Sequence, residues 1–318
     1  MSQADNSADL TVTFLGTGGS TPSRSRSTAS VLFSYQGEQL LIDCGEGTQR
    51  QMQQHKGLVQ VDQLYLTHFH ADHFLGLPGL LLSYQLNGRQ QPLPIYGPVG
   101  LKKLFSTLRP LIGKTDYPIE LVELSAYDEI AGKGYTVHPF AVDHGTKALG
   151  YSFLEDTRPG VFDPQAAKAL GIAPGRDYSL LQQGQTVSGT KGSVSPEQVI
   201  GDARHGRKIT ITGDTAPARQ VVEAAAEAQL LIHDASFDAS DEGKARAALT
   251  RHSTITQAAM IAHQAQVEML ALVHISSRYH VGQLLSKAKR IHAQTIAPRD
   301  HQIISIPLPE RGQPELLG

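Results

Sequence analysis

A dense group of potential metal ligands constrains this sequence more than any other feature. Three histidines and one aspartate lie within the six residues His68-Phe-His-Ala-Asp-His73. The apolar run at residues 64–66 comes just before them, and a strand that ends there can direct His68 and His70 to one side of a tight loop. Asp72 and His73 can then point to the other side. Zinc accepts imidazole and carboxylate ligands where thiolates are absent, so the segment predicts a zinc site rather than a polar surface loop.

Three further candidate ligands follow apolar runs elsewhere in the chain. His144 comes after residues 141–143, Asp214 after 209–213 and His274 after 269–273. Proteins with α/β architecture place functional groups where strands end. Alone, each of these residues would more often be a capping or hydrogen-bonded side chain. Together with the first segment they complete a set of seven ligands, which is enough for two metal ions.

The composition limits the domain organisation and the kinds of site that the protein can contain. The chain has 318 residues, 40% of them hydrophobic and 18% charged, as in an ordinary globular protein that forms one domain with an insertion. Its formal net charge of −2 means that any RNA site must be a local patch. The single cysteine, Cys44, excludes an internal disulfide and a cysteine-rich zinc site.

The sequence also predicts a cytoplasmic location without a membrane segment. Residues 1–10 are polar and lack the basic start and the apolar run of a signal peptide. No apolar stretch approaches the roughly 20 residues that a membrane-spanning helix needs.

Short apolar runs separated by turns predict a mixed order of strands and helices. Strands are expected at residues 10–15, 29–33, 39–42, 64–66, 93–96, 135–142, 208–212, 230–233 and 269–274. Helices are expected at residues 75–86, at 98–108 and from Ile255 onwards. Residues 155–208 differ, because Gly, Pro, Gln and Ser are frequent there and periodicity is weak. Such a long irregular stretch predicts a functional arm or a disordered segment.

The complete ligand set resembles that of the metallo-β-lactamase superfamily. This resemblance implies an αββα sandwich with a dinuclear zinc site at one edge of its sheets, and the irregular stretch at about residues 155–208 would be a flexible arm inserted into it. Two such ions can provide a hydroxide and stabilise the attacking and leaving oxygens of a phosphodiester. The resemblance assigns His68, His70 and His144 to one zinc, Asp72, His73 and His274 to the other, and Asp214 to a bridging position.

Flanking motifs resemble the ribonuclease Z family within that superfamily. They occur in the family's order over nearly the whole chain, as Phe14-Leu-Gly-Thr-Gly18, Asp43-Cys-Gly-Glu-Gly-Thr-Gln49, Gly76-Leu-Pro-Gly79, Tyr96-Gly-Pro98, Thr212-Gly-Asp-Thr215, Arg251-His-Ser-Thr254 and His274-Ile-Ser-Ser-Arg-Tyr279. The resemblance implies a homodimeric, two-zinc endoribonuclease that removes the 3′ trailer from precursor tRNA and leaves a 3′-hydroxyl. It also implies that Asp72 accepts a proton from the attacking water and that His252 donates one to the leaving oxygen.

Two departures from the family pattern concern RNA binding. The family's basic Pro-x-Lys-x-Arg-Asn loop matches Pro22-Ser-Arg-Ser-Arg-Ser27, in which Arg24 and Arg26 keep the positive charge. In the arm, which the resemblance implies grips the tRNA elbow, Gly175-Arg176 replaces a Gly-Pro pair. Arg24, Arg26 and Arg176 are therefore the candidate RNA-binding residues.

Other interpretations of the same residues have to be weighed. A two-zinc hydrolase acting on a small phosphodiester, sulfate ester or lactone would share the ligands, but it would need neither the arm nor the paired arginines. An RNA-binding scaffold without activity would be expected to have lost ligands, whereas all seven remain. His252 has a structural alternative, as an exposed residue in front of a helix capped by Ser253.

Overall fold

The computed structural model describes residues 10–317 and divides into two compact units. Unit 2 is Glu155–Gly206, and unit 1 is formed by the chain on both sides of it. The polar residues 1–9 lie outside the described part. Within residues 10–317, every helix is too short or too polar to cross a membrane.

Unit 1 contains two β-sheets. The first has eight strands in the order β17-β16-β1-β2-β3-β4-β5-β6. Their bounds are β1 Leu10–Gly16, β2 Ser30–Tyr35, β3 Glu38–Ile42, β4 Gln63–Tyr65, β5 Leu93–Pro98, β6 Ile119–Leu124, β16 Ile303–Ile306 and β17 Glu315–Leu317. The second has seven strands in the order β15-β14-β13-β12-β9-β8-β7. Their bounds are β7 Ile130–Ala131, β8 Tyr135–Ala141, β9 Leu149–Glu155, β12 Lys208–Ile211, β13 Leu230–Asp234, β14 Met269–Val273 and β15 Thr295–Ile296.

Alternation along the strands explains why the two sheets are stacked between helices. In β2, Val31 and Phe33 belong to a core that also contains residues of the second sheet, whereas Leu32 packs into a separate cluster with α1 and α3. In β13, Leu230 faces the first core, and Leu231 packs against α7 and α9. Successive side chains of a strand point to opposite faces, so strands that are apolar on both faces need a covering layer on each side.

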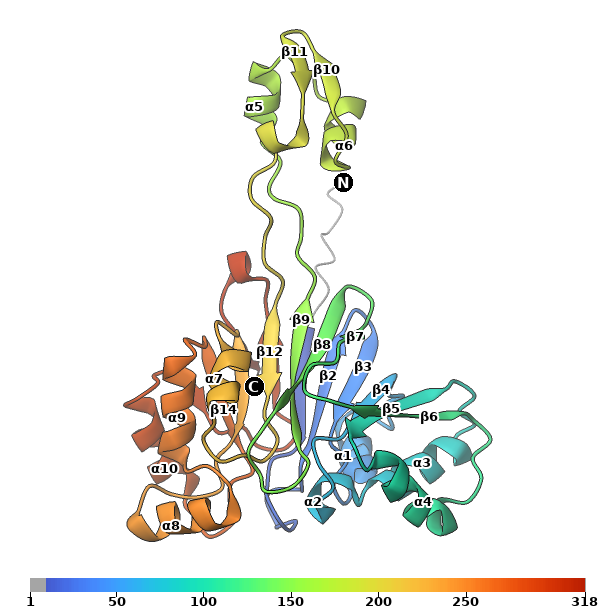
Figure 1. Ribbon diagram of the computed structural model, residues 1–318, viewed down its shortest axis with the longest axis vertical. Helices are drawn as coiled ribbons and strands as arrows, with labels where there is room; N and C mark the ends of the chain where they lie inside the picture. The colour runs from blue at the N-terminus through green and yellow to red at the C-terminus, as the bar shows by residue number, and fades with distance from the viewer. Residues whose placement is uncertain (1–9, 318) are drawn as a thin grey trace. The chain divides into compact units, whose positions relative to one another are not determined.

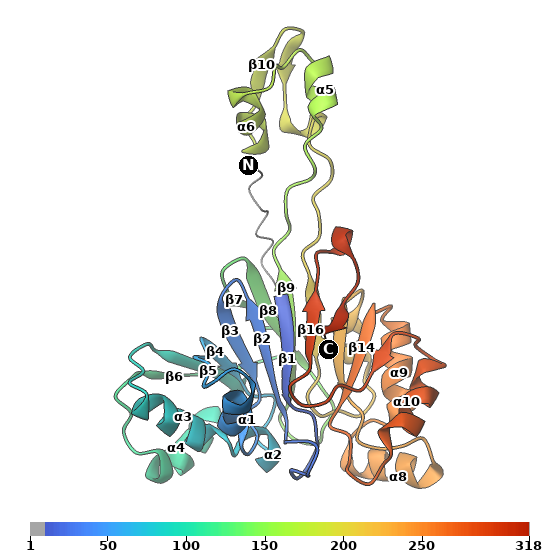
Figure 2. The same ribbon diagram turned by 180° about the vertical axis from the view of Figure 1, so that it is seen from behind.

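The helices of unit 1 supply those two outer layers, as Figures 1 and 2 show. The first sheet is covered by α1 Thr48–His55, α2 Ala71–Phe74, α3 Leu77–Leu86 and α4 Leu101–Ile112. The helices beside the second sheet are α7 Arg219–Ala225, α8 Asp241–Thr250, α9 Ile255–Gln264 and α10 Val281–Lys289. The arrangement is an αββα sandwich, which confirms the predicted fold class.

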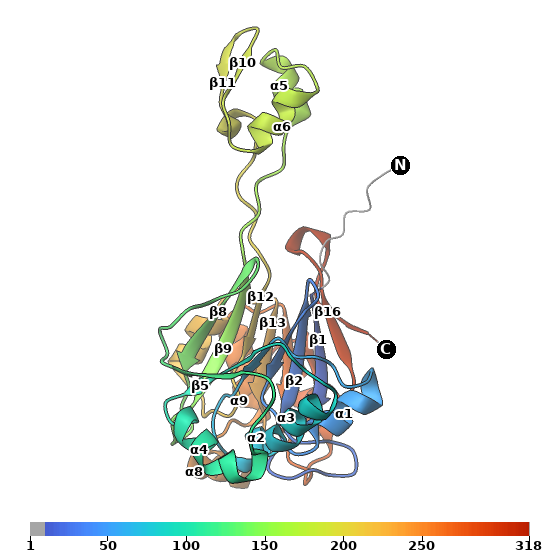
Figure 3. The ribbon, with the colours of Figure 1, turned by 90° about the vertical axis from the view of Figure 1, so that its right-hand side faces the viewer.

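Unit 2 corrects the prediction that this stretch is irregular. It contains α5 Pro164–Ala169, α6 Arg176–Gln182, the hairpin of β10 Val187–Gly189 and β11 Gly192–Val194, and a 3-10 turn at Pro196–Gln198 (Figure 3). Six buried apolar side chains form its own small core: Ala167, Ile172, Leu181, Val187, Val194 and Val199. Helices of six and seven residues contain too few turns for a periodicity to be visible in the sequence.

Some boundaries in unit 1 also differ from the predictions. The helix expected from residue 75 begins at Leu77, after the separate short helix α2. A second difference is α1, which the sequence analysis missed. Among its eight residues only Met52 is apolar, and this side chain is fully buried. One apolar residue cannot produce a helical pattern, so packing rather than sequence periodicity identifies α1.

The aromatic cluster between the sheets yields a stability prediction. Phe153 in β9 lies 4.7 Å from Tyr135 and 5.3 Å from Tyr35, measured between ring centroids. We expect Phe153→Ala to lower the free energy of unfolding by about 3–5 kcal/mol, because it leaves a cavity in this core. Urea unfolding followed by circular dichroism measures the change. The control is Leu249→Ala in α8, whose side chain is 84% exposed. Equal stability of the two variants would contradict this view of the core.

Candidate metal centre

All seven predicted metal ligands meet at one edge of the sandwich, where strands of both sheets end. β4 of the first sheet leads into His68, and β12 and β14 of the second lead into Asp214 and His274. Backbone hydrogen bonds join the sheets at this edge: Leu149 N donates to Thr67 O at 2.9 Å and His274 N donates to Thr17 O at 3.0 Å. The strand ends therefore bring together residues that are far apart in sequence, as the rule that functional groups follow strand ends predicts.

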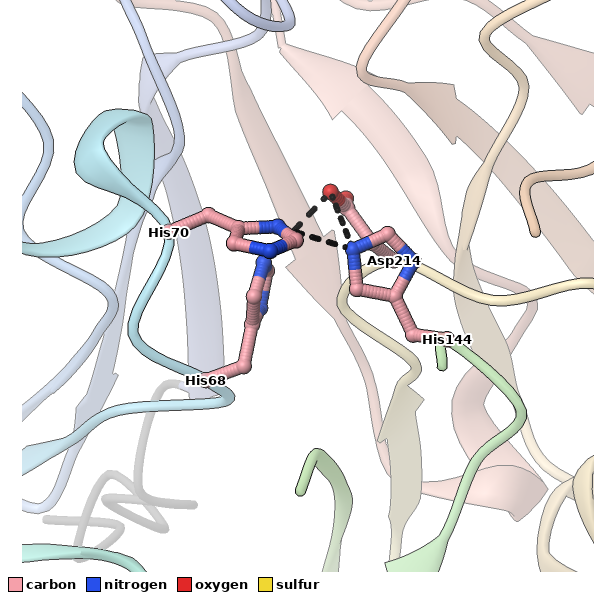
Figure 4. Close-up of side chains that lie close together, drawn as sticks. All are labelled: His68, His70, His144 and Asp214. Carbon is pink, nitrogen blue, oxygen red and sulfur yellow. Dashed lines mark hydrogen bonds and ion pairs between the residues drawn. The ribbon is translucent and has the colours of Figure 1, made fainter. Parts of the chain in front are cut away.

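The first group of ligands consists of His68, His70, His144 and Asp214, whose donor atoms all lie within 4.8 Å of one another. Figure 4 shows the three imidazoles and the carboxylate converging on one point. His70 Nδ1 lies 3.0 Å from His144 Nε2, and His68 Nε2 lies 3.7 Å from Asp214 Oδ2.

The second group consists of Asp72, His73 and His274. His274 Nε2 lies 3.1 Å from Asp72 Oδ2, and His73 Nε2 lies 3.3 Å from Asp214 Oδ2. The same oxygen of Asp214 is 3.4 Å from His274 Nε2 and 3.7 Å from His144 Nε2. Asp214 Oδ2 therefore lies between the two groups, where one carboxylate can serve both.

Hydrogen bonds on the far side of the rings orient four of the histidines. In each case Nδ1 has a protein partner, which turns Nε2 towards the centre. The pairs are His68 with Thr67 Oγ1 at 3.0 Å, His73 with Asp43 Oδ2 at 2.7 Å, His144 with Arg251 O at 3.0 Å and His274 with Ser236 Oγ at 2.7 Å. Such partners fix the tautomer and orientation of metal-binding imidazoles. Asp43 also accepts a hydrogen bond from Thr67 N.

The donor set fits divalent cations. Nε2 of His68 and Nε2 of His73 are buried without a hydrogen-bond partner among the described residues. Buried polar atoms normally have a partner, and two unpartnered nitrogens that face carboxylates match the chemistry of metal ligands. Burial, followed by the nearby His73, holds the pKa of His68 well below its ordinary value, which favours the neutral form that binds a cation.

Asp72 carries a stable negative charge at this centre. Burial alone would raise its pKa, but the hydrogen bond from His274 and the charge of His73 lower the pKa far below the ordinary value. Its Oδ2 also accepts a hydrogen bond from Ser20 N at 2.7 Å. The carboxylate is therefore ionised and fixed in position.

Left-handed backbone conformations recur around the centre. Asp43 has φ 59°, Arg251 has φ 55° and His274 has φ 59°. This region is unfavourable for residues other than glycine, and such strain is concentrated at functional sites. Here each strained residue either is a predicted ligand or holds the imidazole of one.

His252 lies against the ligands rather than in solvent. Its Nδ1 is 2.8 Å from Asp234 Oδ2, and its ring centroid lies 4.8 Å from that of His144 and 5.1 Å from that of His274. Burial lowers the pKa of His252, but Asp234 outweighs this and raises the pKa to about 9. The alternative of an exposed residue before a Ser253 cap is wrong, because Thr254 caps α9 and Ser253 Oγ donates to Thr215 O.

Two residues of the centre, Asp234 and Ser236, were not predicted from the sequence. Asp234 is fully buried, and its Oδ1 accepts a hydrogen bond from Ser236 Oγ at 2.7 Å. The signal for Asp234 was available, since it ends the apolar run of β13, which lies parallel to and between β12 and β14. Asp214 and His274 were predicted as ligands because they follow apolar runs, and the same reasoning applies to Asp234.

The three candidate RNA-binding arginines have different surroundings. Arg24 is exposed, whereas Arg26 is half-buried and its Nη1 donates to Thr17 Oγ1 and to Pro298 O at 2.5 and 2.7 Å. Arg176 lies in unit 2 as the exposed first residue of α6. Arg26 thus has an internal role in the structure, which its position in the sequence does not reveal.

Comparison with known proteins adds independent information about the chain. A family profile described as "Anti-Pycsar protein Apyc1" matches residues 10–132. Among solved structures, the metallo-β-lactamase fold protein YhfI from Bacillus subtilis is 18% identical with a TM-score of 0.69, covering 94% of this chain and 100% of that one. The human short-form tRNase Z is 27% identical with a TM-score of 0.67, covering 93% and 99%. These similarities agree with the αββα sandwich.

Curated relatives match over almost the entire chain. Ribonuclease Z of Methanosarcina acetivorans is 43% identical over 303 residues, which is 94% of this chain and 98% of the relative. Ribonuclease Z of Myxococcus xanthus is 41% identical, covering 88% and 92%. The resemblance predicted from the motifs is confirmed, and the chain belongs to the ribonuclease Z family.

Proposed function

We propose that this protein is a zinc-dependent endoribonuclease that cleaves the 3′ trailer from precursor tRNA and leaves a 3′-hydroxyl on the tRNA. The observation that carries the proposal is the complete set of donors around Asp214 Oδ2, in a chain whose relatives are named ribonuclease Z. Precursor tRNA is the substrate class that this family name implies. A homodimer and a cytoplasmic location remain predictions from the sequence.

The proposed ligands divide into two groups that share one carboxylate. His68, His70 and His144 would hold one zinc ion, Asp72, His73 and His274 would hold the second, and Asp214 would bridge them. Bound there, two zinc ions would lower the pKa of a water molecule and neutralise charge on the phosphate. The remaining work of positioning and proton transfer belongs to the chain's own residues.

Asp72 is the proposed proton acceptor. Its carboxylate is ionised, and Ser20 N and His274 Nε2 both lie within hydrogen-bond distance of the same oxygen. This leaves Oδ1 to accept a hydrogen bond from the attacking water and, as the bond to phosphorus forms, its proton. The role depends on a fixed orientation, which the hydrogen bond from Ser20 N provides, because His274 Nε2 would be bound to zinc.

His252 is the proposed proton donor to the leaving 3′ oxygen. Asp234 binds its Nδ1 at 2.8 Å, which stabilises the protonated imidazole and leaves Nε2 to donate. Cations bound at the neighbouring ligands would lower the pKa of His252 towards neutrality by electrostatic repulsion. Asp234 acts as a positioning residue, since it contacts the imidazole rather than the reacting atoms.

Unit 2 is the proposed exosite for the tRNA elbow. It contributes none of the seven ligands, yet it has its own core and interrupts the sandwich between β9 and β12. Residues 155–208 contain seven Lys and Arg against six Asp and Glu, so the proposed contact depends on shape and on individual cations such as Arg176.

A direct assay of cleavage and metal content tests the proposal. Purified protein incubated with a 3′-extended precursor tRNA should release the trailer, and end-mapping should find a 3′-hydroxyl on the tRNA. Elemental analysis should find about two zinc ions per chain, and chelation should abolish cleavage until zinc is restored. Full activity with a single bound ion would rule out the two-ion arrangement, and cleavage of only a small chromogenic phosphodiester would favour the small-substrate hydrolase.

Replacing His252 separates acid catalysis from a structural role. We expect His252→Ala to lower kcat for precursor tRNA by about 10²–10⁴, because the leaving oxygen then departs without a proton. The loss should be much smaller for bis(p-nitrophenyl) phosphate, whose leaving group needs no proton. His263→Ala, an exposed histidine of α9, is the matched control and should behave like the wild type. Equal losses on both substrates, or loss of zinc, would assign His252 a structural role instead.

Shortening unit 2 tests the exosite. Replacement of residues 160–200 by a short Gly/Ser linker should raise KM for precursor tRNA and leave hydrolysis of the small phosphodiester near the wild-type rate. The loss should depend on salt to the extent that Arg176 and its neighbours contact phosphates. The measurement is kcat/KM for both substrates at two salt concentrations. Unchanged tRNA processing by a folded, shortened protein would remove the exosite from the proposal.

A further inference from the structure

The residue directly before His252 adopts a backbone conformation that its own side chain disfavours. Arg251 caps the C-terminus of α8 with φ 55° and ψ 52°, which is the left-handed region. Helices commonly end with glycine in this conformation, because a Cβ atom makes it costly. Such strain persists only where surrounding contacts hold it, and it is concentrated at functional sites. The contacts of Arg251 therefore indicate what the conformation is for.

Arg251 contacts the segment around one candidate ligand through both its backbone and its side chain. Its carbonyl oxygen accepts the hydrogen bond from His144 Nδ1 at 3.0 Å. Its Nη1 donates to Asp143 Oδ1 at 2.6 Å. Its side chain also covers Gly145, where an added Cβ would lie 3.1 Å from Arg251 Cδ. Arg251 thus holds residues 143–145 at three points, with the ligand in the middle.

Asp143, the partner of Arg251, is tied in turn to the loop of the central carboxylate. Its backbone N donates to Thr215 Oγ1 at 3.1 Å, and its carbonyl oxygen accepts a hydrogen bond from Ala216 N at 2.8 Å. Thr215 and Ala216 directly follow Asp214. Among residues 10–317, Arg251 is the one ion-pair partner of Asp143. The ion pair therefore connects the end of α8 to the loops of two candidate ligands.

The other side of His252 is anchored by different contacts. Ser253 N donates to Asp234 Oδ2 at 3.2 Å, and Ser253 Oγ donates to Thr215 O at 2.7 Å. Both of these hydrogen bonds are buried, whereas the side chain of Arg251 is 55% exposed. His252 therefore lies between an inner anchor at Ser253 and an outer anchor at Arg251.

We propose that the ion pair of Asp143 and Arg251 is a clamp that positions His252 for proton transfer and His144 for metal binding. The pair holds Arg251 in its left-handed conformation, which keeps its carbonyl oxygen on His144 Nδ1. The same conformation places the next residue, His252, with its ring centroid 4.8 Å from that of His144. Asp143 and Arg251 are positioning residues, because they act through the two histidines. This inference rests on the proposed function of His252 as the proton donor.

A direct contact with RNA is the alternative role for an exposed arginine at this edge. The guanidinium of Arg251 is already bound by a carboxylate, and the negative charge of Asp143 would repel a phosphate placed beside it. Ion pairs between exposed side chains add little to global stability, so the clamp acts on local geometry. Displacement of a reacting group by about 1 Å can lower a rate by up to about 10²-fold.

Variants of the pair test the clamp at saturating zinc. Arg251→Ala and Asp143→Ala should each lower kcat for precursor tRNA about tenfold and leave KM within about twofold. Hydrolysis of bis(p-nitrophenyl) phosphate should fall less than threefold, since its leaving group needs no proton. The double variant should be no slower than the single variants, because all three lose the same pair. Arg246→Ala, which breaks an exposed ion pair with Glu242 in the same helix, is the matched control and should behave like the wild type.

Comparison of glycine with alanine at position 251 separates the clamp from a contact with RNA. Both substitutions remove the guanidinium, but glycine adopts a positive φ without strain. Arg251→Gly should therefore retain a higher kcat for precursor tRNA than Arg251→Ala. A phosphate contact predicts equal losses instead, through a raised KM and a slope of log KM against log salt that falls by about one.

Two readouts of the clamp require no cleavage. Zinc release to a chelator should be several-fold faster in Arg251→Ala and Asp143→Ala, because the imidazole of His144 is then less well oriented. In the zinc-free protein, hydrogen–deuterium exchange should be faster at the amide of His252, which donates to Ala247 O at 2.9 Å. Tm should stay close to the wild-type value, as expected for the loss of an exposed ion pair.

The outcomes that overturn the clamp differ from those that overturn the proposed function. Wild-type kcat, zinc release and amide exchange in Asp143→Ala would overturn the clamp, even if the wild type cleaves precursor tRNA normally. Equal losses in Arg251→Gly and Arg251→Ala that arise from KM would assign Arg251 to RNA binding and also overturn it. A wild type that binds zinc but does not cleave precursor tRNA contradicts the proposed function. Faster zinc release and amide exchange in the variants would still support the clamp in that case.

Discussion

The carboxylate of Asp214 is the constraint on which the rest of this structure depends. It is buried, and its Oδ2 lies within 4.0 Å of imidazole nitrogens from His68, His73, His144, His252 and His274. Burial raises the pKa of Asp214, but His274 and His73 outweigh it and hold the pKa far below the ordinary value. Burial of an isolated charge would cost a large amount of free energy. The imidazoles around Asp214 therefore have to be held in place together with its carboxylate.

The sandwich provides this fixation by joining the ends of two sheets. Each sheet alone carries only part of the set of candidate ligands. The backbone hydrogen bonds from Leu149 to Thr67 and from His274 to Thr17 hold the two sheets together at this edge. The partners behind the imidazoles, such as Asp43 and Ser236, come from strand ends at the same edge. The strained conformations of Asp43, Arg251 and His274 persist because packing on both sides determines them.

Chemistry and RNA binding are separated in the proposed enzyme. The metal ligands, Asp72 and His252 act on a single phosphodiester bond and carry no information about the length or shape of the RNA. Unit 2, which has its own core and contributes none of the seven candidate ligands, offers a separate surface for RNA. A protein with a net charge of −2 can bind RNA in this way because a few exposed cations at defined places replace a general positive field.

The sequence by itself determined the αββα sandwich, through the resemblance that its motifs carry, and it identified the seven candidate ligands that the structure brings together. Strand alternation and strand ends are local patterns, and the spacing from His68 to His73 is visible in six consecutive residues. Only the tertiary structure decided which partners those residues meet. Asp234 reaches His252 across 18 positions, and Arg26 reaches Pro298 across 272 positions, which gives a candidate RNA-binding residue an internal contact as well. The helix α1 escaped detection because it contains a single apolar residue, and the helices of unit 2 escaped detection because they are too short for a periodic signal. Local patterns follow from backbone geometry and can be read along the chain, whereas hydrogen-bond partners depend on which segments the packed sheets bring together.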